Sequence, residues 1–160
     1  MALAIMVSTR LWLGGAISPH RDLDLIQVLA NKIRKVALCR PLLLAVDGLS
    51  SYVTAFRKAF RTALPPRKGE LGRPQLVSWP NIAIVQVVKQ RVDGQLNIAR
   101  RIVQGNEAMV HSLIQKPQGT GMINTAFIER FNAILRQRIN CLTRRTRSLA
   151  RKVQTLETGM

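Results

Sequence analysis

Two acidic residues stand out because each lies where a protein can hold a carboxylate in a fixed position. Asp47 ends the apolar run at residues 41–48, and Glu129 is the one acid in the arginine-rich stretch at residues 123–152. Phosphodiester chemistry on DNA uses two divalent metals about 3.5–4 Å apart, and hard cations of the Mg²⁺ type prefer carboxylate oxygens. Asp47 and Glu129 are therefore candidate catalytic residues and candidate ligands for Mg²⁺ or Mn²⁺.

Both acids also have ordinary structural interpretations. Asp47 precedes Gly48, and Asp-Gly pairs commonly form turns at the ends of strands. Glu129 lies near the start of a predicted helix, where a carboxylate complements the positive end of the helix dipole. These structural roles do not exclude metal binding, so the sequence leaves both interpretations open.

The charge of the chain points to a polyanionic partner. Its 160 residues include 25 Lys and Arg against 8 Asp and Glu, which gives a formal net charge of +17. Such an excess predicts salt-sensitive attraction to phosphate backbones and makes DNA the leading partner. A membrane surface is disfavoured because the basic residues are spread over several predicted elements rather than along one amphipathic helix. An RNA-binding protein is the weaker alternative, because no aromatic pattern of the RRM type is present.

The candidate DNA contacts lie mostly on the helix that carries Glu129 and beyond it. Asn132 and Arg136 follow Glu129 by one and two helical turns, so they could orient the carboxylate or contact a phosphate. An ordinary solvated surface is the alternative for both, and for Lys89 on a predicted strand. The full set is Lys89, Arg130, Asn132, Arg136, Arg138, Arg144, Arg145, Arg147 and Arg151.

Cysteine usage and the apolar segments favour a cytoplasmic protein. Cys39 and Cys141 show no CxxC or Cys/His ligand spacing, which argues against a zinc site and against a secreted disulfide scaffold. We expect both to be buried free thiols. The first residues have no basic region followed by a long apolar region, and no stretch reaches the length needed to span a membrane.

Hydrophobic spacing predicts the elements of the N-terminal half. Apolar runs at 2–7 and 11–17 predict a hairpin, and Gly14 and Gly15 suggest a bulge or a close backbone approach. A helix is expected at 22–38 and a fully buried strand at 41–48. The segment 50–64 should be a second helix that begins at Ser50 or Ser51 and buries Phe56 and Phe60.

The C-terminal half is predicted to hold one more strand and two helices. Residues 81–92 have the β-branched alternation of a strand, while 94–105 read as either a short strand or a basic loop. A helix is expected from residue 124, with Ile128, Phe131, Leu135 and Leu142 on one face, and a last basic helix at 143–156. This order predicts an α/β sheet covered by helices, in which ligands lie beyond the strand ends.

Four segments together resemble one family. "LWLGGAIS", "LLLAVDGLSSYVTAF", "WPNIAIVQVVKQR" and above all "INTAFIERFNAILRQRINCLTRRTRSLAR" are similar to the DDE transposases of bacterial insertion sequences, which have the RNase H-like (retroviral integrase) fold. The resemblance implies a mixed sheet flanked by helices over residues 1–140 and a basic helical extension at 141–160. It also implies that Asp47 and Glu129 are the second and third acids of a metal-binding triad.

The family's substrates are the ends of insertion elements and target DNA, and the resemblance implies these partners here. It also implies assembly with a second copy or with a full-length transposase. The first catalytic aspartate of the family lies on a strand that would precede residue 1, and Asp22 and Asp24 do not occupy its position. We therefore expect an unpaired central position in the sheet and no independent activity. The alternative function is a non-enzymatic basic DNA-binding protein, either an inactive remnant or a transposition inhibitor.

Overall fold

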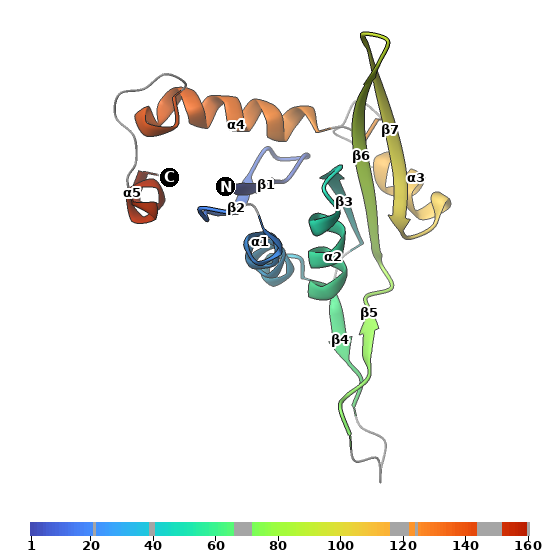
Figure 1. The fold of residues 1–160 in the computed structure, drawn as a ribbon. Helices are drawn as coiled ribbons and strands as arrows, with labels where there is room; N and C mark the ends of the chain where they lie inside the picture. Colours follow the sequence, from blue (N-terminus) through green and yellow to red (C-terminus); the bar gives the residue numbers. More distant parts are fainter. Residues whose placement is uncertain are drawn as a thin grey trace.

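The computed structural model describes residues 1–20, 22–38, 41–65, 72–115, 122–123, 125–143 and 152–159. These residues form a mixed α/β arrangement of strands and helices (Figure 1). The strands fall into a hairpin, a three-stranded mixed sheet and a short two-stranded ribbon. The predicted α/β class with a mixed sheet and flanking helices is confirmed at this level.

The N-terminal hairpin consists of β1 (Ala2–Ile5) and β2 (Trp12–Ala16), paired antiparallel. The register shifts between Ala4 and Ile5, so one residue of β2 bulges out. A Cβ atom on Gly15 would lie 2.6 Å from Cδ2 of Leu3, which no side chain could tolerate without movement. Both the hairpin and the special geometry at its glycines are confirmed.

The mixed sheet has the order β3–β6–β7. Strand β3 (Leu42–Asp47) runs parallel to β6 (Ile82–Val92), which pairs antiparallel with β7 (Gln95–Gln104). A two-residue turn at Asp93 and Gly94, with φ of 50° and 78°, connects β6 to β7. This is the backbone that tight hairpins favour, and it makes the ambiguous segment 94–105 a full strand.

The prediction that β3 is fully buried is wrong. Val46 is the one residue of β3 that is buried, and Ala45 is exposed. Among the described strands β3 pairs with β6 alone, so its other edge has no strand beside it. Five consecutive apolar residues thus form an edge strand of the described sheet.

Helices α1 (Leu23–Val36) and α2 (Ser50–Ala59) pack against each other and cover one face of the strands. Asp22 begins α1, and its carboxylate accepts a hydrogen bond from the backbone N–H of Leu25 at 3.0 Å. Helix α2 is capped by Leu49, so the predicted cap at Ser50 or Ser51 is wrong. The core side chains are Ala2, Ala16, Leu25, Ile26, Leu29, Ala30, Ile33, Val46, Ala55, Phe56, Ala59, Phe60, Ile82 and Ile84.

The predicted extension of the second helix to residue 64 is also wrong. Phe60 leaves the helical conformation with φ of −91° and ψ of 56°, and β4 (Arg61–Ala63) then pairs with β5 (Leu76–Ser78). The backbone N–H of Trp79 bonds the carbonyl of Phe60 at 3.1 Å, and its indole N–H bonds Thr62 at 2.6 Å. These long-range bonds outweigh the local helical pattern.

Helix α3 (Glu107–Gln115) was not expected from the sequence and covers the opposite face of the sheet. Its Val110 packs with Ala83 and Val85 of β6 in a second, smaller core. Helices therefore flank the β3–β6–β7 sheet on both faces. The apolar residues of α3 are less clearly gathered on one face than those of α1. Hydrophobic spacing alone therefore did not predict this helix.

Helix α4 (Ala126–Arg138) ends before the predicted face is complete. Leu142 belongs to a separate short turn, η1 (Asn140–Leu142), and Thr143 is extended, so neither continues a helix as predicted. The last described helix, α5, spans Val153–Gly159, while residues 144–151 of the predicted basic helix lie outside the described residues. Cys39 also lies outside them, and Cys141 is half-buried with a free thiol, not fully buried as expected.

Candidate functional site

Asp47 lies at the carboxyl end of β3, as predicted. Its Oδ1 atom accepts a hydrogen bond from the backbone N–H of Leu49 at 2.9 Å. This bond closes the turn from β3 into α2, so the structural interpretation of the Asp-Gly pair is confirmed. One hydrogen bond uses only part of what a carboxylate can accept, so the turn does not by itself exclude a ligand.

Glu129 lies in the first turn of α4 and is fixed by two donors. The hydroxyl of Thr125, which is only 7% exposed, donates to its Oε1 atom at 2.5 Å. The ammonium of Lys89 donates to the same oxygen and forms an ion pair. The hydrogen bond from Lys89 lowers the pKa of Glu129, the bond from Thr125 adds to this, and partial burial opposes both. Glu129 is therefore a positioned, ionised carboxylate at neutral pH.

The sheet register and one ion pair place Asp47 and Glu129 beside the same stretch of β6. Asp47 is paired with Val87 on β6, and Lys89 lies two residues further, about 7 Å along the strand. Side chains two residues apart on a strand share a face. Lys89 therefore lies on the same face of the sheet as Asp47 and also holds Glu129 of α4, although the two acids are far apart in sequence.

The described residues do not complete a two-metal centre. Two carboxylates are a suitable donor type for Mg²⁺ or Mn²⁺, but a pair of metals needs a further ligand that bridges them. Across the described part of the chain, no group of three or more His, Cys, Asp or Glu side chains comes together. In addition, Lys89 already neutralises Glu129. The metal expected from the resemblance therefore does not fit these two acids alone.

The predicted DNA contacts on α4 are accessible. Arg130, Arg136 and Arg138 are exposed and Asn132 is half-buried, and no residue of α4 is buried. Lys89 differs from them because it is engaged by Glu129. The remaining four predicted contacts lie outside the described residues, namely Arg144, Arg145, Arg147 and Arg151.

Two positioning residues were not predicted as part of the site. Thr125 precedes Glu129 by four residues, and this helical spacing was a usable signal for their contact. Arg100 of β7 donates to the carbonyl of Ile123 at 2.6 Å and so holds the segment before α4 against the sheet. The sequence offered no comparable signal for Arg100, because its strand was ambiguous.

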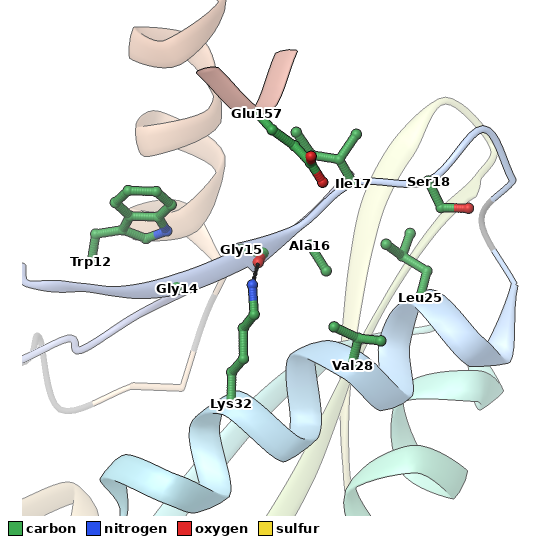
Figure 2. A pocket seen from close by; sticks show the side chains of 10 residues that line it. All are labelled: Trp12, Gly14, Gly15, Ala16, Ile17, Ser18, Leu25, Val28, Lys32 and Glu157. Atoms are coloured by element: carbon green, nitrogen blue, oxygen red, sulfur yellow. Dashed lines mark hydrogen bonds between the residues drawn. The ribbon is translucent and has the colours of Figure 1, made fainter. Parts of the chain in front are cut away.

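A separate cavity of about 580 Å³ lies beside β2 and α1 and includes neither acid. Figure 2 shows Lys32 reaching from α1 to the carbonyl of Gly15, to which it donates a hydrogen bond at 2.7 Å. Glu157 of α5 and Trp12 also line this cavity. The Lys32 ammonium thus binds the backbone of β2. The two acids lie outside this cavity, at an exposed edge that suits a long polymer better than a small molecule.

Replacing Glu129 with glutamine should lower the free energy of unfolding by about 0–1 kcal/mol at pH 7, because exposed ion pairs are weak. The side chains of Lys89 and Glu129 are 36% and 55% exposed. A lowered folded-state pKa stabilises the protein above the pKa of the unfolded glutamate, about 4.3, and this stabilisation is lost as pH falls further. Urea unfolding should therefore show a lower free energy of unfolding for Glu129→Gln than for the parent at pH 7, and equal values for the two proteins at pH 3.

The matched control for this change is Glu107→Gln, in the first turn of α3. Like Glu129→Gln, this substitution removes an interaction with the helix dipole. Glu107 forms no ion pair with another described residue, so the control leaves out the contribution of an ion pair. An equal loss of stability from Glu107→Gln would mean that Lys89 contributes nothing to the fold.

No protein-family model, curated protein or solved structure matches this chain. None of the described helices combines the length and apolar character needed to cross a bilayer.

Proposed function

We propose that this chain is a DNA-binding protein of the insertion-sequence transposase type, with an RNase H-like core. The observation that carries the proposal is one stretch of β6. Its Val87 pairs with Asp47 at the end of β3, and its Lys89 forms an ion pair with Glu129 of α4. Residues from three separate segments meet there beside an exposed row of arginines.

Within this proposal Asp47 and Glu129 are the second and third acids of a metal-binding triad. The residues of this chain orient the two carboxylates and attract the DNA backbone. Activity requires a third carboxylate at this edge, so the chain alone binds DNA without cleaving it.

A second candidate function is favoured by the Lys89–Glu129 ion pair. A lysine that neutralises a catalytic carboxylate opposes metal binding, which suits a protein that only binds DNA. Such a protein would act as a non-enzymatic inhibitor, occupying element ends or pairing with a full-length transposase. The two candidates share the DNA surface and differ in whether Asp47 and Glu129 matter.

Nicking of supercoiled plasmid in Mn²⁺ tests the proposal. The purified chain should bind the plasmid and leave it uncut, because a misplaced or missing group in such a site costs about 10²-fold or more in rate. Glu129→Gln should bind DNA as well as the parent or better, since a negative charge is removed from a basic surface.

Two variants decide between the outcomes of this assay. Nicking by the parent that both Asp47→Asn and Glu129→Gln abolish would show that the chain assembles a working metal site, which would contradict the requirement for a third carboxylate. Failure to bind DNA at all would refute the proposal as a whole. Unchanged binding in both variants, without nicking, is the result expected of this proposal, and the inhibitor shares it.

A further inference from the structure

The β6–β7 ribbon extends away from the rest of the protein. Every residue from Lys89 to Asn97 is exposed, and the turn at Asp93 and Gly94 closes the end tightly. In Figure 1 this end of the ribbon reaches past α4. The two cores of the protein do not extend to it, so burial does not explain why the strands continue this far.

One face of the ribbon is held against the segment that begins α4. On this face Lys89 lies opposite Ile98, and Arg100 lies opposite Val87. Lys89 forms an ion pair with Glu129, and Nε of Arg100 donates to the carbonyl of Ile123 at 2.6 Å. These contacts fix the direction of the ribbon and occupy the cations near its base.

The opposite face carries four uncharged amides, with Val88, Ala99 and Val92 between them. Gln90 lies directly across from Asn97, and Gln86 lies across from Arg101. Gln95 follows at the turn, opposite Val92. No hydrogen bond joins any of these polar side chains to another described residue. This amide face, defined as Gln86, Gln90, Gln95, Asn97 and Arg101, therefore offers donors and acceptors that an external ligand can satisfy.

An amide N–H can donate to a phosphate oxygen, but both the donor and the acceptor of an amide are used at a base edge. A carboxamide has no net charge, so it adds little to the attraction of a polyanion. It does provide a donor and an acceptor in one plane, which pair with the N6 and N7 positions of adenine in the major groove. That groove is about 12 Å wide and admits a two-stranded ribbon.

We infer that the β6–β7 ribbon enters the major groove of duplex DNA and reads base edges with its amide face. This inference rests on the proposed DNA-binding function and adds to it an element that distinguishes sequences. The arginines of α4 contact the backbone without reading sequence, while the ribbon supplies the base contacts. Asp93 at the turn meets the groove floor, where cytosine N4 offers a donor to a carboxylate.

A shortened ribbon provides the first test. Deleting residues 91–92 and 95–96 lets Asp93 and Gly94 connect Gln90 directly to Asn97. These two residues already face each other, and two pairs from the turn they form the hydrogen-bonded type of pair that closes a two-residue turn. Every deleted residue is exposed, so the fold should persist, as thermal unfolding will check. The deletion removes one charged residue, Arg91, so Arg91→Ala in the full-length ribbon has the same net charge and serves as the matched control.

Fluorescence anisotropy with duplexes enriched by the parent protein from a random pool measures the effect. We expect the shortened variant to bind at least about tenfold more weakly than Arg91→Ala, because removing one bidentate base contact already costs that much. The double variant Gln90→Ala/Asn97→Ala should bind the enriched sequence about tenfold or more weakly than the parent does. Its slope against salt should stay unchanged, since its net charge is that of the parent.

Each other outcome overturns a defined part of the proposal. Equal binding by the shortened variant and Arg91→Ala, or an intact preference in the double amide variant, would refute insertion of the ribbon while leaving DNA binding intact. A preference of the parent for single-stranded RNA over duplex DNA would refute the duplex partner. Absence of any DNA binding by the parent would refute the proposed function itself.

Discussion

Raising the salt from 50 to 200 mM should weaken binding of this chain to duplex DNA by about 10³- to 10⁵-fold, as expected for a protein with roughly 6–10 phosphate contacts. The physical reason is the release of counterions from DNA when lysines and arginines neutralise its phosphates. The chain has a formal net charge of +17, which is ample for that number of contacts. Fluorescence anisotropy over a series of KCl concentrations measures the slope.

Substitution tests whether the arginines of α4 are responsible for this dependence of binding on salt. Replacing Arg130, Arg136 and Arg138 together with glutamine should reduce the slope by up to about 0.9 for each phosphate that the variant no longer neutralises. A control with the same change in charge replaces Lys58, Arg61 and Arg73, which are exposed around β4 and β5, at the opposite end from α4 in Figure 1. Equal slopes for the two variants would mean that the charge acts diffusely and that α4 is not the contact surface.

Replacing Phe60 with alanine should lower the free energy of unfolding by about 3–5 kcal/mol. Phe60 is 1% exposed, and its ring centroid lies 6.2 Å from that of Phe56 and 5.2 Å from that of Trp79. The substitution leaves a cavity where α2 meets β4 and removes both ring contacts, which themselves stabilise the core. Urea unfolding followed by circular dichroism measures the decrease in stability.

Phe127→Ala is the matched control for this prediction. Phe127 is half-buried on α4, and its ring lies beneath the guanidinium of Arg10, with 3.4 Å between the ring centroid and the Cζ atom. Both substitutions delete the same atoms, but the Phe127 side chain buries less apolar surface in the folded protein than the Phe60 side chain does. The decrease in unfolding free energy should therefore be less than half of that for Phe60→Ala. A larger decrease at Phe127 would mean that the core is centred near α4 and not between α1 and α2.

The elements with strong local patterns were predictable from the sequence. Helix α1, the β1–β2 hairpin and β3 follow from the spacing of their apolar residues, from Asp22 as a cap and from the glycines of β2. These signals act between residues close in sequence, so no knowledge of the fold is needed to interpret them. The positions of Asp47 at a strand end and of Glu129 in a first helical turn were predictable for the same reason.

Other features depend on residues that are far apart in sequence. The end of α2 is decided by Trp79, which bonds Phe60 and Thr62 across the β4–β5 ribbon. The exposure of Ala45 depends on which strands lie beside β3. In each case the local pattern was compatible with two outcomes, and a distant partner selected one of them.

The sequence by itself determined the basic charge, the α/β class and the local placement of Asp47 and Glu129, because composition and short-range spacing carry that information. Only the tertiary structure decided that Lys89 of β6 neutralises Glu129 of α4, and that Thr125 holds the same oxygen. An ion pair across 40 residues of sequence forms when the sheet register and a helix position bring two side chains together. Neither position is encoded within the segment that contains the residue.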